Sequence, residues 1–302
     1  MPELLIIGAN GVLGSAAARY FLEKGYGITV FIRNKNKAAE LEKLGMKVIV
    51  GDLTNPGTII NSCKNIDVVL TAAHGLLGRG KNKSKNVDED GHKFLIDEAK
   101  KSAVKHLIYT SINTASPNHP VDFYRTKYVI EQYLIKSGLN YTILKLPAFM
   151  EWHAYNLLGK SIVQKGKTTI LGAGNNPTNF IAVKDVVAAL DKIMLNENYY
   201  NQKLLLGGPQ NRSKNEVAEL FGKALNIHPK VGHVPIPVLK IFSVLLQPLH
   251  PGIARIMKLS LATENSNETM PIENSIEQFG LQPTTIEEFI QTVIEKPDAK
   301  KA

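Results

Sequence analysis

The stretch Leu4-Leu5-Ile6-Ile7-Gly8-Ala9-Asn10-Gly11-Val12-Leu13-Gly14-Ser15 decides the fold of this chain. Its four leading apolar residues predict a buried strand, and the residues from Ser15 onward predict a helix that begins directly after the turn. Gly8, Gly11 and Gly14 lie between them at the spacing G-x-x-G-x-x-G. A strand, a glycine turn and a helix start bring backbone N–H groups and the positive end of a helix to one point, which suits a pyrophosphate.

Each glycine of this turn has its own expected role. Gly8 permits the tight turn, Gly11 leaves room for a phosphate, and Gly14 lets the helix lie close to the strand. The alternative is an ordinary strand-to-helix turn that merely requires glycine, and the sequence context favours a dinucleotide site instead. The remaining turn residues that we expect to contact the cofactor are Asn10, Val12 and Leu13.

Composition places the chain among soluble globular proteins. It has 302 residues, 44% of them hydrophobic and 21% charged, enough for one large α/β domain and a smaller part. We expect a cytoplasmic location, because no secretory signal or membrane span is visible and Cys63 is the only cysteine. Cys63 itself is expected to be a buried, unreactive thiol. The net charge of +9 is spread without interleaved aromatics, which favours a basic surface that attracts an anionic cofactor over a nucleic-acid partner.

Strands and helices alternate through residues 1–150, which predicts a doubly wound parallel sheet covered by helices on both faces. This part is the expected NAD(P)-binding core. Residues 151–302 are expected to form mainly a smaller C-terminal lobe that covers a substrate, with segments near 179–192 and 203–208 returning to the core.

The C-terminal part contains two expected helix N-caps and one unusual apolar segment. Asp185 precedes an apolar helix, and Ser213 with Glu216 forms a capping box. The apolar stretch within residues 236–249 is too short to span a bilayer. A core or lid helix is the expected reading of it, with a dimer face or a membrane-surface contact as alternatives.

The end of the second predicted strand indicates which nicotinamide cofactor binds. The acidic residue typical of NAD sites is absent there, and the chain reads Phe31-Ile32-Arg33-Asn34-Lys35. Arg33 can bind a 2′-phosphate through its planar guanidinium, and Lys35 or Lys37 can add charge. NADP(H) is therefore preferred and NAD(H) is possible, although an ordinary exposed basic turn is the alternative.

Two further strand ends are expected to contact the cofactor. Asp52 follows the third strand, where its carboxylate can accept from the adenine amino group while Leu53 packs on the ring. Alternatively, Asp52 or Thr54 caps the next helix. Ala72 and Ala73 end the fourth strand, and their small side chains leave a path for the pyrophosphate and the nicotinamide ribose.

Several motifs in order along residues 3–225 resemble the short-chain dehydrogenase/reductase superfamily, in its NmrA-like and isoflavone-reductase-like branch. The resemblance implies a Rossmann fold, NADP(H) binding and a substrate lobe built from the C-terminal part. The motifs that carry it are Gly8–Gly14, Arg33-Asn34, Gly51-Asp52-Leu53-Thr54, Val104–Ser111, Arg125–Glu131, Ser137–Leu144, Asn179–Val186 and Leu206-Gly207-Gly208-Pro209.

The resemblance also implies a catalytic helix, from which this chain departs. Typical members carry a tyrosine four residues before a lysine, and here Phe123 occupies that place before Lys127. Tyr124 lies three residues before Lys127 and still shares its helical face. The resemblance implies that Lys127 binds the nicotinamide ribose, with Tyr124 at most auxiliary, whereas a surface pair of Lys127 with Glu131 is the alternative. Ser111 is the expected residue to polarise a substrate oxygen, unless it only satisfies backbone.

Two functions follow as hypotheses. The first is an NADPH-dependent oxidoreductase that reduces a carbonyl or a conjugated bond of a small, apolar molecule, without a metal. Phe149, Met150 and Trp152 favour it because they supply apolar surface for a substrate pocket. The second is a non-catalytic NADP(H)-binding redox sensor or assembly subunit. Phe123 favours this function, because it occupies the position of the tyrosine that typical members carry.

Overall fold

The computed structural model describes residues 1–295, apart from the side chains of Asn274 and Ile276. The chain forms two compact units. The first unit consists of Met1–Lys145 together with Val187–Leu204, and the second consists of Leu146–Val186 together with the chain from Leu205 onward. Each unit is thus built from two separate stretches of sequence.

The first unit contains a seven-stranded sheet with the strand order β10-β6-β5-β4-β1-β2-β3. Successive strands extend away from β1 to one side through β2 and β3, and to the other side through β4, β5 and β6. This reversal between β1 and β4 is the point of a doubly wound sheet where ligands bind. The strands are β1 (Glu3–Ile7), β2 (Gly27–Ile32), β3 (Lys47–Val50), β4 (Val68–Thr71), β5 (His106–Ile112), β6 (Tyr141–Leu146) and β10 (Gln202–Leu205).

Parallel pairing aligns the strand ends at the centre of this sheet. β1 pairs in parallel with β2 and with β4, and β4 pairs in parallel with β5. The register places Ile7, Thr71 and Tyr109 in one row across β1, β4 and β5. The predicted Rossmann-like α/β fold with a parallel central sheet is therefore confirmed.

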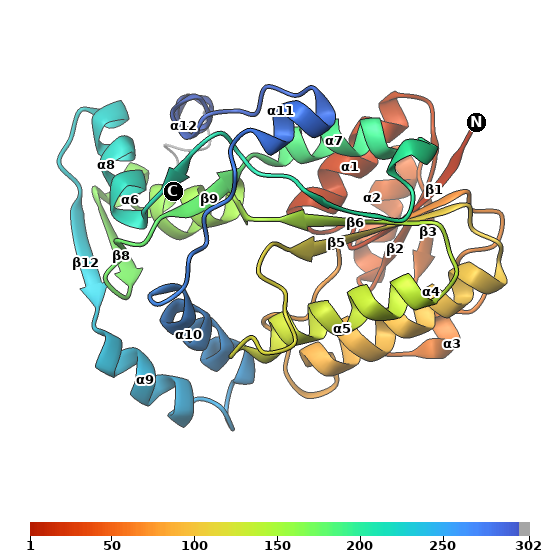
Figure 1. Ribbon diagram of the computed structural model, residues 1–302, viewed down its shortest axis with the longest axis horizontal. Helices are drawn as coiled ribbons and strands as arrows, with labels where there is room; N and C mark the ends of the chain where they lie inside the picture. The colour runs from red at the N-terminus through yellow and green to blue at the C-terminus, as the bar shows by residue number, and fades with distance from the viewer. Residues whose placement is uncertain (296–302) are drawn as a thin grey trace. The chain divides into compact units, whose positions relative to one another are not determined.

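Helices cover both faces of this sheet. Figure 1 shows α1 and α7 on one face and α4 and α5 on the other. An ion pair of 2.6 Å between Lys24 at the end of α1 and Asp191 in α7 joins the two helices of the first face. The helical segments of this unit are α1 (Val12–Glu23), η1 (Lys35–Lys37), α2 (Ala38–Lys43), α3 (Pro56–Ile59), η2 (Gly80–Asn82), η3 (Lys85–Asp90), α4 (Gly91–Lys101), α5 (Asp122–Lys136), η5 (Glu197–Tyr199) and α7 (Val183–Ile193), which begins in the second unit.

The strands of the first unit are apolar because their side chains form its hydrophobic core. The side chains of Leu4-Leu5-Ile6-Ile7 are at most 1% exposed, because helices cover both faces of β1. Cys63 is fully buried in the same core, as predicted, and burial raises the pKa of its thiol to about 12. The thiol is therefore protonated and unreactive near neutral pH.

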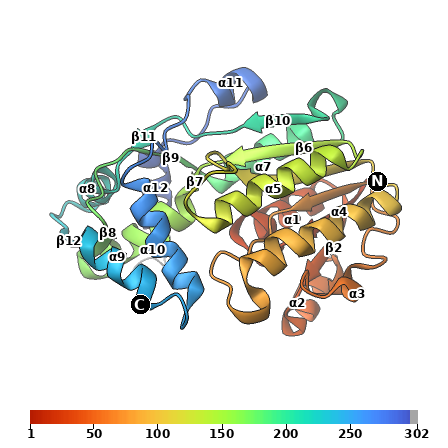
Figure 2. The ribbon, with the colours of Figure 1, turned by 60° about the horizontal axis from the view of Figure 1, so that its bottom comes forward.

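The second unit holds two small sheets, one with the order β11-β9-β7 and one that pairs β12 with β8. Figure 2 shows its helices α9 and α10 beside each other. Among the residues described, no helix of either unit is long and apolar enough to cross a membrane. The elements are β7 (Ala148–Phe149), η4 (Met150–Gly159), α6 (Lys160–Lys165), β8 (Lys167–Leu171), β9 (Thr178–Ile181), β11 (Asn211–Arg212), α8 (Lys214–Leu225), β12 (Lys230–Val234), α9 (Ile236–Leu245), α10 (Pro251–Thr263), α11 (Asn274–Phe279) and α12 (Ile286–Ile294).

One of the two predicted helix caps is correct. Ser213 and Glu216 form the expected capping box at the start of α8. The prediction that Asp185 caps a helix is wrong, because α7 begins two residues earlier, at Val183. The Asp185 carboxylate instead accepts hydrogen bonds from the backbone N–H and the hydroxyl of Thr284, at 2.7 and 3.0 Å. This partner lies 99 residues away, so no local pattern reveals it.

Candidate dinucleotide site

The turn after β1 needs glycine at two of its three glycine positions for structural reasons. Gly8 has a φ of +93°, and a Cβ there would lie 2.8 Å from the backbone nitrogen of Ala73. A Cβ on Gly14 would overlap the carbonyl oxygen of Gly8. Gly11 differs, since its φ is −82° and the nearest atom to a Cβ is the Gly8 oxygen at 3.2 Å. The fold itself therefore demands Gly8 and Gly14, whereas a Cβ on Gly11 would require the Gly8 carbonyl to shift by only a few tenths of an ångström.

The N-terminus of α1 presents backbone N–H groups without a side-chain cap. Gly11 is the N-cap residue, and the first turn of α1 contains no acidic side chain. The backbone N–H of Gly11 is bonded to the Gly8 carbonyl, whereas the Ser15 hydroxyl points back to the carbonyl of Val12. Three or four uncapped N–H groups and the positive helix end favour an anion at this place.

The strand ends form one continuous edge beside this turn. Because Ile7, Thr71 and Tyr109 share a row, the residues that follow them, Gly8, Ala72 and Thr110, emerge together. Ala72 and Ala73 are half-buried. With strands about 4.8 Å apart, the ends of β1 and β5 are separated by roughly 10 Å. The edge is therefore wide enough for an extended ligand to pass over β4.

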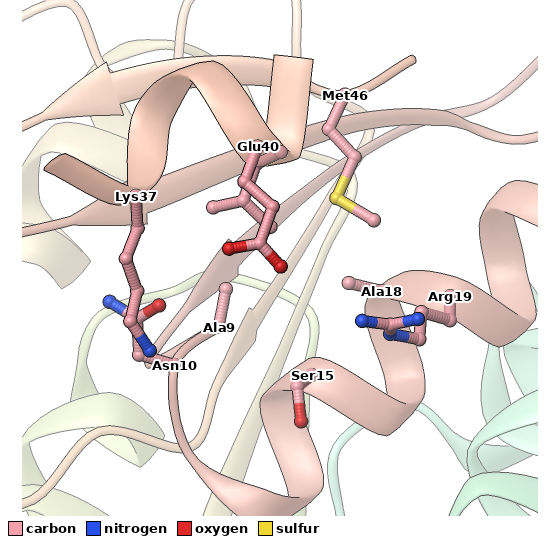
Figure 3. Close-up of a pocket in the computed structure, with 9 residues that line it drawn as sticks. Ala9, Asn10, Ser15, Ala18, Arg19, Lys37, Glu40 and Met46 are labelled. Atoms are coloured by element: carbon pink, nitrogen blue, oxygen red, sulfur yellow. The ribbon is translucent and has the colours of Figure 1, made fainter. Parts of the chain in front are cut away.

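A hollow of about 180 Å³ lies between α1 and α2 (Figure 3). It brings Asn10 of the glycine turn together with Lys37, at the end of η1. Arg33 and Lys35 are exposed directly after β2, close to the hollow in sequence but outside its lining. The lining consists of Ala9, Asn10, Ser15, Ala18, Arg19, Lys37, Glu40, Leu41 and Met46.

The residues expected at the adenine lie after β3. Asp52 is half-buried, and its carboxylate accepts a hydrogen bond of 2.9 Å from the backbone N–H of Thr54. The alternative in which Asp52 or Thr54 caps the next helix is wrong, because Asn55 is the N-cap of α3. Leu53 is 6% exposed and belongs to the hydrophobic core.

Lys127 of α5 is buried at the sheet edge. Its side chain is 4% exposed, and its ammonium donates a hydrogen bond of 3.0 Å to the carbonyl of Thr110. The same ammonium lies 4.7 Å from the centre of the Tyr109 ring. Burial lowers the pKa of Lys127, and the nearby carboxylates of Asp88 and Glu131 partly oppose that shift. Lys127 is thus a desolvated cation, and the alternative of an exposed helix-surface pair with Glu131 is wrong.

The start of α5 shows how the phenylalanine and the tyrosine are placed. Phe123 is 5% exposed, and its ring meets the exposed ring of His74 edge-on at 6.0 Å between centroids. Tyr124 is half-buried and stacks on His119, at 4.1 Å and 13°. The phenylalanine therefore borders the loop after β4, while the tyrosine packs on the loop before α5.

Ser111, at the end of β5, is held by a buried carboxylate. Its hydroxyl donates a hydrogen bond of 2.5 Å to Glu131, which is only 1% exposed. Lys145 and Lys203 balance the charge of this carboxylate, at 3.7 and 3.6 Å. Because the proton of the Ser111 hydroxyl is engaged, its lone pairs are left to accept bonds from a ligand or the backbone.

Sequence reasoning missed two buried groups that shape this edge. Asp88 accepts from the backbone N–H of Gly75 at 2.9 Å and from the Ser84 hydroxyl at 2.6 Å, which fixes the loop after β4. His92 bonds Thr71 through Nε2 and the Val87 carbonyl through Nδ1. Burial and the charge of Lys127 lower the pKa of His92 to about 4, so Nδ1 carries its proton near neutral pH. Both residues fall in an ordinary-looking helical stretch, and no spacing signal marks them.

The described residues contain no cluster of three or more His, Cys, Asp or Glu side chains arranged to hold a metal ion. The groups at this edge that can donate a proton or a hydrogen bond are instead the Lys127 ammonium and the hydroxyls of Ser111 and Tyr124. Together with the uncapped start of α1, they form a site suited to an anionic ligand with sugar hydroxyls.

The sequence and the structure resemble proteins with reductase and assembly roles. Ycf39 of Cyanophora paradoxa, a photosystem II assembly factor, is 29% identical over 243 residues, which cover 79% of this chain and 74% of Ycf39. The NAD(P)H azoreductase of Xenophilus azovorans is 26% identical over 223 residues, 73% of each chain. The NADPH complex of the quinone oxidoreductase QOR2 from Escherichia coli shares the fold, with a TM-score of 0.76, 18% identity, and coverage of 97% of this chain and 100% of QOR2.

The family itself is established by a match that extends over nearly the whole described chain. The model of the NmrA-like family matches residues 2–290. This range includes the glycine turn, the α5 helix with Lys127, and most of the second unit. The resemblance that the sequence motifs indicated is confirmed, and the chain belongs to the NmrA-like family.

Proposed function

We propose that this protein is an NADPH-dependent reductase that acts on a carbonyl or a conjugated bond of a small, apolar molecule. The observation that carries the proposal is the shared sheet edge. One end of the edge has an uncapped helix start behind a glycine turn, and the other has the buried Lys127 ammonium on the Thr110 carbonyl. A dinucleotide needs an anion site and a hydroxyl-binding donor in such an arrangement.

The residues present fit a phosphorylated dinucleotide. The glycine turn can serve as a cradle for a phosphate, because Gly11 brings no side chain to the uncapped start of α1. The backbone of Asn10, Val12 and Leu13 forms part of this cradle. In our proposal Arg33 and Lys37 bind the 2′-phosphate, since both are exposed cations near the turn and Lys37 shares the hollow with Asn10.

The adenine and nicotinamide ends use other residues of the same edge. We assign the adenine side to Asp52 and Leu53, although the core position of Leu53 restricts it to a van der Waals contact at the rim. Ala72 and Ala73 form the floor beneath the pyrophosphate. Lys127 holds the ribose hydroxyls, and its low exposure strengthens that bond by removing competing water.

When bound, NADPH supplies the hydride, and the protein orients the partners and holds the proton sources. In our proposal the Ser111 hydroxyl turns its proton from Glu131 to the substrate oxygen and donates a hydrogen bond there. Tyr124 is at most an auxiliary donor, because its ring stacks on His119. The azoreductase and quinone oxidoreductase relatives support a conjugated, apolar substrate class.

Cofactor titration with a matched pair of glycine variants tests the proposal. Gly11→Val keeps an allowed backbone conformation, so the protein should fold but lose NADPH binding by at least about tenfold. Gly232→Val is the control, because it lies in strand β12 and its Cβ has only ordinary contacts beyond 3.6 Å. Calorimetry and NADPH fluorescence measure both. Equal affinity of Gly11→Val and the wild type would contradict the proposed site.

The second candidate function is a non-catalytic NADP(H)-binding sensor or assembly subunit. Phe123 in the place of the usual tyrosine and the similarity to an assembly factor favour it. Only the reductase would oxidise NADPH catalytically. Oxidation of NADPH in the presence of quinones, azo dyes or enones identifies the reductase, whereas tight binding without oxidation across that panel identifies the sensor or subunit.

A further inference from the structure

Helix α9 is apolar on almost every side, although it lies at the surface. It reads Ile236-Pro237-Val238-Leu239-Lys240-Ile241-Phe242-Ser243-Val244-Leu245. Only Leu239 and Ser243 of this helix are buried, and α9 packs against α10 (Figure 2). A helix that is apolar all round normally lies in a protein core or in lipid. Within the second unit, α9 is therefore not buried as a core helix would be.

The exposed apolar side chains of α9 and its two flanks form one patch, which we name the α9 patch. Ile241 lies at its centre, with Val238, Val244 and Leu245 three or four residues away and thus on the same outward face. Single exposed apolar residues are ordinary, but a contiguous group of this kind marks an interaction surface. Its members are Leu249 (73% exposed), Val244 (68%), Leu245 (59%), Ile241 (57%), Phe242 (44%), Ile253 (40%), Ile236 (36%) and Val238 (36%).

The stretch of sequence that carries the α9 patch has charged side chains of a single sign. Residues 220–263 contain no Asp or Glu, although the whole chain has 27 of them. Lys240 is exposed on α9 itself, at the flank between the outward and the buried faces. Lys230 is exposed in β12, just before α9, and Lys258 is half-exposed on α10. Apolar side chains flanked by Lys240, and by Lys258 through its bond to Gln247, complement a surface that is apolar inside and anionic outside.

We infer that α9 is an interfacial anchor that lies flat on an anionic phospholipid bilayer. The α9 patch enters the boundary between headgroups and acyl chains, and Lys240 pairs with lipid phosphates. Ten residues of helix are about 15 Å long, which is half the thickness of a bilayer core, so α9 lies in the interface and does not cross it. A second copy of this chain is the less suitable occupant, because it would bring Lys240 of each copy together without an Asp or Glu from either α9 segment to pair with it.

Vesicle flotation of the full-length chain tests the anchor. The wild type should float with vesicles of phosphatidylcholine and phosphatidylglycerol, bind pure phosphatidylcholine at least about fivefold less, and lose affinity as salt rises. Ile241→Glu should reduce binding by at least about tenfold, because it places a charge at the centre of the patch. Lys240→Ala should reduce binding by about fivefold through the loss of one cation.

A matched variant shows whether the effect belongs to α9. Ile60→Glu introduces the same charge at a side chain that is 56% exposed in the first unit, close to the 57% of Ile241. It should bind vesicles like the wild type. Equal loss in Ile60→Glu and Ile241→Glu would overturn the inference, as would a wild type that binds no anionic vesicle. A dimer in light scattering that Ile241→Glu converts to monomer, with no vesicle binding, would assign the patch to a second copy and likewise overturn it.

Discussion

The hydroxyl of Ser111 and the carboxylate of Glu131 are joined by a hydrogen bond of 2.5 Å, in a place where both side chains are at most 3% exposed. Glu131 lies one helical turn after Lys127 on α5, so the same helix that carries the buried ammonium also fixes the serine at the end of β5. Glu131 also forms ion pairs with Lys145 and Lys203. The rotamer of Ser111 is therefore set by α5.

This bond predicts a measurable cost for removing the hydroxyl. Ser111→Ala should lower the free energy of unfolding by about 1.5–3 kcal/mol, because a buried bond to a charged carboxylate is lost. Ser102→Ala is the control, since its hydroxyl makes a longer bond of 3.3 Å to Glu98. Urea denaturation measures both variants. If the two lose the same stability, the Ser111–Glu131 bond has no special role.

The second prediction separates Lys127 from Tyr124. Lys127→Met should weaken NADPH binding and slow any turnover, because it removes the proposed ribose ligand at the edge of the sheet. Tyr124→Phe should change both quantities much less, because it keeps the ring that stacks on His119. Calorimetry and the rate of NADPH oxidation provide the two readouts.

A particular result with Tyr124→Phe would reverse this assignment. If that variant bound NADPH normally but lost nearly all turnover, Tyr124 would be the proton donor and Lys127 its partner. The pH dependence adds a further check on Lys127. Because burial lowers its pKa, the ammonium loses its proton below the usual lysine range, and NADPH affinity should fall as pH rises toward that range.

Arg33 is predicted to determine the preference for the phosphorylated cofactor. Arg33→Ala should weaken NADPH by about tenfold or more and leave NADH nearly unchanged, because only NADPH carries the 2′-phosphate. Lys43→Ala, another exposed cation at the end of α2, is the control and should affect neither. Titration of each variant with both cofactors measures the ratio. Parallel losses for NADPH and NADH would show that Arg33 acts on the fold.

Cys63 predicts how stability depends on alkaline pH. Its pKa is raised to about 12 in the folded state, against about 8.5–9 in an unfolded chain. The stabilisation is therefore complete below about pH 8.5 and is lost as pH rises toward 12. Between pH 8 and pH 10 the wild type should lose about 1.4 kcal/mol more than Cys63→Ala, in urea unfolding at the two pH values. Equal slopes would show that the thiol ionises as easily in the folded protein as in water.

The sheet and the glycine turn can be predicted from the sequence, because both depend on the order of residues that are close together along the chain. Four apolar residues before Gly8 predict a strand buried on both faces, and the structure has Leu4–Ile7 in that position. Helix ends were harder to predict. The helix α3, for example, ends at Ile59 after a single turn, and Asn61 adopts a φ of +65°. Propensity gives no reason for such an early end.

The candidate site was predictable only where neighbours in sequence are neighbours in space. The turn residues share that property, whereas the partners of Lys127 and Ser111 come from β5, β6 and β10. Lys203 reaches Glu131 from 72 positions later in the chain. The sequence left open whether Lys35 or Lys37 adds charge beside Arg33, and only the path of η1 shows that Lys37 lines the hollow with Asn10.

The first unit is built from two stretches of sequence that are separated by part of the second unit, and this order affects its folding during synthesis on the ribosome. When residue 146 has left the exit tunnel, β6 is the outer strand of the sheet and its free side has no partner, because β10 is still to be translated. An unpaired edge of this kind is a template for joining another nascent chain. β10 covers the free side of β6 only after residues 202–205 emerge, so a pause in translation between the two segments should raise the aggregated fraction in a cell-free system above that of uninterrupted translation.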